Sequence, residues 1–110
     1  MAIVTVAEAT QTAVVGTEHT LTTQTGIGTY VLTVDTINMV NGDVLELRIN
    51  TKVRASGNTQ LAYMAVYAHA QGVLNKYSVP VPLPLSREII FTLKQTAGTA
   101  RAFAWGVLTL

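Results

Sequence analysis

The sequence contains no cysteine, which excludes a disulfide framework, a thiolate metal site and a cysteine nucleophile. Charged residues make up only 12% of the 110 positions, about half of the usual share in a soluble globular domain. Because a free monomer usually keeps a well-charged surface, this scarcity of charge predicts that a partner covers part of the surface.

Clustered positive charge and long hydrophobic runs are also missing. The net charge is +1 and the Lys and Arg residues are scattered, so we expect neither nucleic acid nor an anionic membrane as a partner. No stretch approaches the roughly 18 apolar residues of a membrane-spanning helix. Residues 1–8 lack the basic region and apolar run of a signal peptide, so we expect synthesis in a cytoplasm without export.

Catalytic and metal-binding motifs are sparse. The acidic residues form no pair or triad of recognisable spacing; they are Glu8, Glu18, Asp35, Asp43, Glu46 and Glu88. His19 and His69 lack the spacing of metal ligands, and Gly26-Ile27-Gly28 lacks the helix and Lys-Ser or Lys-Thr pair of a phosphate-binding loop. We therefore expect a surface His19, a strand-borne His69, a turn at the glycines, and no catalytic residue, metal or cofactor.

Residues that favour strands are abundant. Thr, Val and Ile occupy 37 positions, and branching at Cβ favours the extended backbone. Apolar residues make up 49% of the chain, enough for the single core that a chain of this length can build. Short strand patterns separated by turn residues predict an all-β fold, an antiparallel β-sandwich of jelly-roll type. We expect residues 16–110 to form the sandwich and residues 1–15 to form an edge strand or an arm.

Three strands follow from alternation of apolar and polar residues. Their inward residues are Tyr30, Leu32 and Val34 in 29–35, Leu45, Leu47, Ile49, Thr51 and Val53 in 44–54, and Ile89, Phe91 and Leu93 in 88–94. Asn41-Gly42-Asp43 predicts a turn before the second of them. The polar face with Glu46, Arg48, Lys52 and Arg54 fits a solvated surface better than a docking site for an acidic partner.

The C-terminal region predicts a hairpin, in which Ala97-Gly98-Thr99 joins the strand at 88–94 to a strand at 101–109. Phe103, Trp105 and Val107 share one face there, which places Trp105 in the core. The small residues Ala102, Ala104 and Gly106 leave the opposite face open to close approach by another layer.

Two segments allow alternatives. Residues 60–70 fit a helix or a strand, and the flanking Gly57-Asn58 and Gly72 favour a strand, central or at an interface because both its faces are apolar. The segment from Pro80 to Pro84 has proline at every second position, so it must be an extended edge or a loop. Trp105 and the four tyrosines could form a platform for sugars, but Trp105 and Tyr30 alternate in phase with core residues.

Three sequence motifs carry a resemblance to a known group of proteins. They are Gly42-Asp43-Val44-Leu45-Glu46-Leu47-Arg48-Ile49, Gly57-Asn58-Thr59-Gln60, and a closing pattern of Ala97, Gly98, Thr99, Arg101, Phe103 and Trp105. From about Thr17 onward the chain resembles small structural proteins of tailed bacteriophages. The resemblance implies a β-sandwich virion component that decorates or cements the capsid.

The expected partners are the major capsid protein of a phage and further copies of the chain, with a trimer among the expected forms. The expected location is the capsid surface, after synthesis in the host bacterium. The expected contact residues are Ile3, Val4, Val6, Val79, Pro80, Val81, Pro82, Leu83, Pro84 and Leu85. A tail, neck or fibre-tip module for host attachment and a carbohydrate-binding domain are the alternatives.

Overall fold

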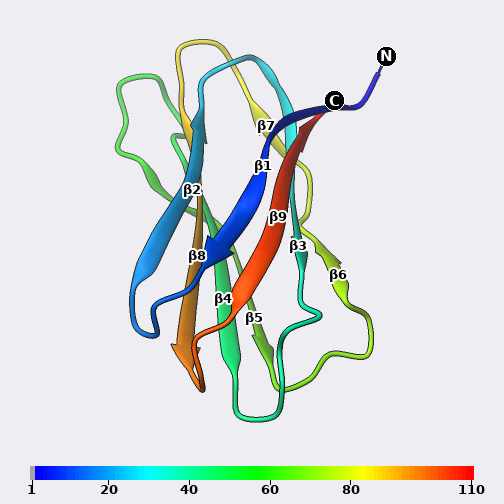
Figure 1. Ribbon diagram of the computed structural model, residues 1–110. Coiled ribbons are helices and arrows are strands. Elements are labelled where there is room, and N and C mark those ends of the chain that lie inside the picture. Colours follow the sequence, from blue (N-terminus) through cyan, green and yellow to red (C-terminus); the bar gives the residue numbers. More distant parts are fainter. Residues whose placement is uncertain (1) are drawn as a thin grey trace.

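Nine strands and no helix are found in residues 2–110, the part of the chain that the computed structural model describes. The strands are β1 (Val4–Thr12), β2 (Glu18–Gln24), β3 (Gly28–Asp35), β4 (Val44–Thr51), β5 (Gln60–Ala68), β6 (Asn75–Tyr77), β7 (Val81–Leu83), β8 (Ile89–Ala97) and β9 (Ala102–Thr109). They form two antiparallel sheets packed together, as Figure 1 shows. The predicted antiparallel β-sandwich is confirmed.

The strand order explains how one chain builds both layers. Sheet A has the order β1-β9-β3-β6, with β7 also paired to β3, and sheet B has the order β2-β8-β4-β5. The two halves of the chain pair with each other, β1 with β9, β2 with β8, β3 with β6 and β7, and β4 with β5. A long hairpin folded over in this way into a five-stranded and a four-stranded layer has the topology of a jelly roll.

The core lies between the sheets and is built from the alternating residues of the predicted strands. The buried side chains include Tyr30, Leu32, Val34, Leu45, Leu47, Ile49, Ile89, Phe91, Leu93, Phe103 and Val107. Each large apolar side chain buried in this way contributes about 1.5–3 kcal/mol. Trp105 is half-buried and packs against this cluster, so its predicted place inside the core is only partly correct.

Three sequence predictions need correction. The predicted C-terminal hairpin does not form, because its two strands lie in different sheets. β8 belongs to sheet B and β9 to sheet A, and the turn between them crosses from one layer to the other. The strand predicted at 44–54 ends at Thr51, and Val53 is 91% exposed in the following loop. Residues 60–68 are a strand as predicted, but β5 lies at the edge of sheet B.

Residues 4–12 and 81–83 are both edge strands of sheet A. β1 pairs only with β9, and β7 pairs with β3, where Pro82 lies opposite Thr29. Proline is tolerated there because an edge strand has one side whose amide positions need no partner.

Candidate interaction surfaces

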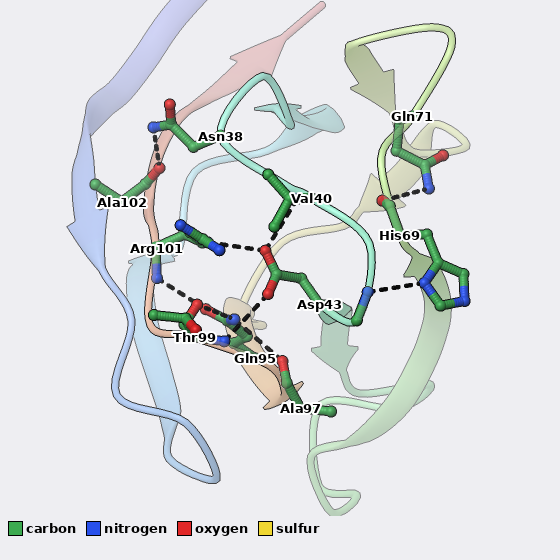
Figure 2. Close-up of polar contacts among 11 residues, drawn as sticks. Asn38, Val40, Asp43, His69, Gln71, Gln95, Ala97, Thr99, Arg101 and Ala102 are labelled. Atoms are coloured by element: carbon green, nitrogen blue, oxygen red, sulfur yellow. Dashed lines mark hydrogen bonds and ion pairs between the residues drawn. The ribbon is translucent and has the colours of Figure 1, made fainter.

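One end of the sandwich, formed by the loops 13–17, 36–43, 69–74 and 98–101, holds a network of polar contacts (Figure 2). Asp43 lies at its centre and is 1% exposed. Its carboxylate accepts hydrogen bonds from Val40 N at 3.0 Å, Thr99 N at 3.1 Å and Arg101 Nε at 2.9 Å. We call this end the turn end.

The contacts of Asp43 keep its carboxylate charged. Burial acts to raise its pKa, but the hydrogen bonds from Val40, Arg101 and Thr99 and the positive charge of Arg101 outweigh burial, and the pKa is lowered from its ordinary value. A buried carboxylate that is paired and hydrogen-bonded in this way is stable as the anion.

The turn that follows β8 is shaped around this carboxylate. Gln95 is buried; its Nε2 donates to the carbonyl oxygens of Ala97 and Thr99, and its Oε1 accepts from Arg101 N. Gly98 has φ +92°, and a Cβ there would lie 2.7 Å from Cα of Asp43, so only glycine fits. The sequence motifs at 42–49 and 97–105 therefore meet at this carboxylate.

The two histidines also serve the backbone of the turns. His19 Nε2 accepts from Val14 N at 3.0 Å, and His69 Nδ1 accepts from Gly42 N at 2.9 Å. His69 follows β5 with φ 66° and does not lie in a strand, in contrast to the prediction.

Within residues 2–110 no group of three or more His, Cys, Asp or Glu side chains is placed to hold a metal ion. Over the same residues, no helix has the length and apolar character needed to cross a membrane.

The opposite end of the sandwich, like the turn end, carries exposed apolar side chains. It consists of residues 2–4, the loops 25–27, 52–59 and 84–88, and Leu110, and we call it the N-terminal end. Its exposed residues are Ile3, Val4, Ile27, Val53, Leu85 and Leu110. Val4, Thr109, Tyr30 and Val81 lie in one row across sheet A, and Figure 1 places both termini and the β7–β8 connection at the same end of the sandwich.

The N-terminal end also carries positive charge. Lys52, Arg54 and Arg87 lie in the loops of the N-terminal end with one acidic residue, Glu88. Lys52, Arg87 and Glu88 line a hollow of about 290 Å³ with Thr25 and Ser86. Arg87 Nε is buried there without a hydrogen-bond partner in the described part of the chain. A buried donor without an acceptor is costly.

The predicted contact residues divide by burial. Ile3, Val4, Val79, Pro80, Pro82, Pro84 and Leu85 are exposed, Val6 and Val81 are half-buried against the core, and Leu83 is 2% exposed within it. The side chain of Leu83 supports the fold and cannot reach a partner. Sequence reasoning missed Ile27, Val53 and Leu110. An isoleucine between two glycines was the available signal for Ile27, whereas Val53 was assigned to the end of a strand.

A second surface lies on the outer face of sheet B. Leu61, Met64 and Val66 form a row of half-exposed apolar side chains on β5, and no charged residue or proline occurs at 60–68. Edge strands usually carry such residues, because they prevent pairing with another chain. Beside this row, Arg48 forms ion pairs with Glu46 and Glu18, which leaves β4 as a polar face with its charges paired.

Comparison of the chain with models of protein families, with curated proteins and with solved structures found no match. The function is therefore argued from these surfaces and from the resemblance of the three motifs.

Proposed function

We propose that this chain is a structural protein of a tailed-phage particle that binds the outside of the head and cements neighbouring capsomers. The observation that carries the proposal is the N-terminal end, where exposed apolar residues of both termini and three loops lie at the same end of the sandwich as Lys52, Arg54 and Arg87. Exposed apolar side chains gathered in this way mark interaction sites in soluble proteins.

Weak contacts repeated over many copies are sufficient to stabilise a capsid. Apolar surface buried in a contact contributes about 25 cal/mol per Å², so each copy binds modestly. Many copies on one shell add their contributions, and a partner subunit held by several of them separates more slowly. A contact made by loops of a folded jelly roll does not require a flexible segment to be ordered first.

The charge at the N-terminal end defines the partner further. Exposed apolar residues at the same end as Lys52, Arg54 and Arg87 fit a capsid surface that carries both apolar and acidic side chains. A carboxylate of the capsid protein placed in the hollow would pair with the positive charges of Lys52 and Arg87, which line it. We further propose that copies of the chain associate with one another through the uncharged edge of β5.

The proposal is tested on particles stripped of this protein and then supplied with purified variants. Val53→Lys and Leu85→Lys place a charge at the N-terminal end, and Ile37→Lys and Val73→Lys place the same charge on exposed apolar positions of the turn end. We expect wild type and the turn-end variants to restore resistance to heat and osmotic shock, and the N-terminal variants to fail. Equal resistance of stripped and restored particles would exclude cementing and favour a tail, neck or fibre-tip location.

A further inference from the structure

A separate hollow of about 220 Å³ lies on the outer face of sheet A, across β1, β9, β3 and β6. These strands lie side by side in Figure 1. Ala104 and Gly106 of β9 form its floor, and Glu8, Asp35, Asn75 and Tyr77 stand around them. The hollow belongs neither to the turn end nor to the N-terminal end.

The hollow exists because the outward residues of β9 are small. Side chains alternate between the faces of a strand, so Phe103 and Val107 fill the core while Ala104 and Gly106 leave the outer face low. A Cβ at Gly106 would lie 3.2 Å from Oγ1 of Thr33 and 3.8 Å from Cβ of Glu8. Thr33 Oγ1 donates to the carbonyl oxygen of Gly106 at 3.1 Å, which holds the two strands in register below the hollow.

The polar groups around the hollow have capacity to bind. One oxygen of Asp35 accepts from Ile37 N at 2.9 Å, which fixes the carboxylate and leaves its second oxygen for a ligand. Across residues 2–110, the side chains of Glu8, Asn75 and Tyr77 take part in none of the hydrogen bonds. Acceptors and donors from three strands therefore face one small space.

Tyr77 differs from the other tyrosines of the chain. Tyr30 is buried in the core, and Tyr63 and Tyr67 are half-buried against it, with Lys76 Nζ 4.9 Å from the ring of Tyr67. The Tyr77 side chain is 63% exposed beside the hollow. An exposed aromatic ring next to unpaired polar groups offers an apolar face and hydrogen bonds to one ligand.

We propose that this hollow binds a neutral pyranose ring of a glycan. The apolar face of such a ring packs on Tyr77, its hydroxyls donate to the carboxylates of Glu8 and Asp35, and its oxygens accept from the amide of Asn75. Hydrogen bonds to carboxylates are stronger than those to neutral acceptors. No Lys or Arg lines the hollow, so acidic sugars are repelled. Its volume is below the roughly 300–1,000 Å³ of pockets for larger ligands, so it suits one ring.

The test is saturation-transfer NMR of the full chain with methyl glycosides of neutral hexoses, and with a uronic acid for comparison. We expect millimolar binding of at least one neutral glycoside and none of the acidic sugar. Tyr77→Ala and Ala104→Leu should weaken binding at least tenfold, whereas Val14→Ala and Ala70→Leu, matched exposed changes at the turn end, should not. Circular dichroism confirms that each variant is folded.

The proposal is overturned if no neutral glycoside binds, if the acidic sugar binds as well as the neutral ones, or if the four variants bind alike. Resistance of particles to heat does not enter this experiment, so the glycan site and the cementing role stand or fall separately.

Discussion

Removal of the Asp43 carboxylate is the perturbation for which the structure gives the clearest magnitude. Asp43→Ala leaves Val40 N and Thr99 N without their acceptor and Arg101 without its counter-charge. A buried donor that loses its partner costs about 1–3 kcal/mol, and breaking a buried charge pair costs about 3–5 kcal/mol.

Solvent reduces the sum of these losses. The Arg101 side chain is 28% exposed, so water replaces part of its lost interaction. We therefore expect Asp43→Ala to lower the free energy of unfolding by about 3–4 kcal/mol, a large part of the roughly 5–15 kcal/mol typical of a domain. At about 4 °C per kcal/mol for a chain of this size, the melting temperature falls by about 12–16 °C.

Urea unfolding at neutral pH, followed by the fluorescence of Trp105, measures this change as a shift of the midpoint at constant slope. Asp35→Ala is the matched control, because Asp35 accepts one hydrogen bond, from Ile37 N, and its loss costs about 1 kcal/mol. If Asp43→Ala costs no more than Asp35→Ala, then Asp43 does not hold the turn end together and the interpretation of Figure 2 is wrong.

The remaining predictions concern pH, a glycine and the β5 edge. The pKa of Asp43 is lowered in the folded protein, so its contribution to stability is present above the ordinary pKa of about 3.9 and is lost as the pH falls through the folded pKa. The free energy of unfolding of Asp43→Asn should therefore change less with pH between pH 5 and 2 than that of the wild type. Gly98→Ala should lower the free energy of unfolding by about 2–5 kcal/mol, because a left-handed alanine is strained and its Cβ clashes with Asp43. Gly16 is also at positive φ but has nothing within 4 Å, so Gly16→Ala should lower it only by the strain of about 1–2 kcal/mol. Equal losses for the two variants in thermal unfolding would refute the clash. Val66→Lys should leave the melting temperature within a few degrees and abolish any self-association seen by sedimentation, and unchanged association would remove β5 as the contact.

Local patterns predicted the strands whose residues alternate between core and solvent. Tyr30, Leu32 and Val34 on β3 and Ile89, Phe91 and Leu93 on β8 are buried as their spacing indicated. The same patterns do not tell which strands pair. Ala97-Gly98-Thr99 fits a hairpin and a crossing between sheets equally well, and the crossing is fixed by contacts with Asp43, which lies 56 residues before Thr99.

Strand ends and surfaces depend on neighbours that are distant in sequence. Alternation continues through Val53 although β4 ends at Thr51, where Thr51 Oγ1 donates to the carbonyl oxygen of Glu88. Leu83 was expected at an interface because it lies among prolines. The pairing of β7 with β3 directs its side chain into the core instead. The hollow on sheet A escaped prediction because β1, β3, β6 and β9 each contribute to it.

Localisation of the protein in an intact particle by cryo-electron microscopy decides whether it cements the head. We predict many copies on the outside of the head at the junctions between capsomers, with Val53, Leu85 and the N-terminal strand facing the shell. A few copies at the tail or fibre tip, or copies on the head attached through the turn end, would contradict it.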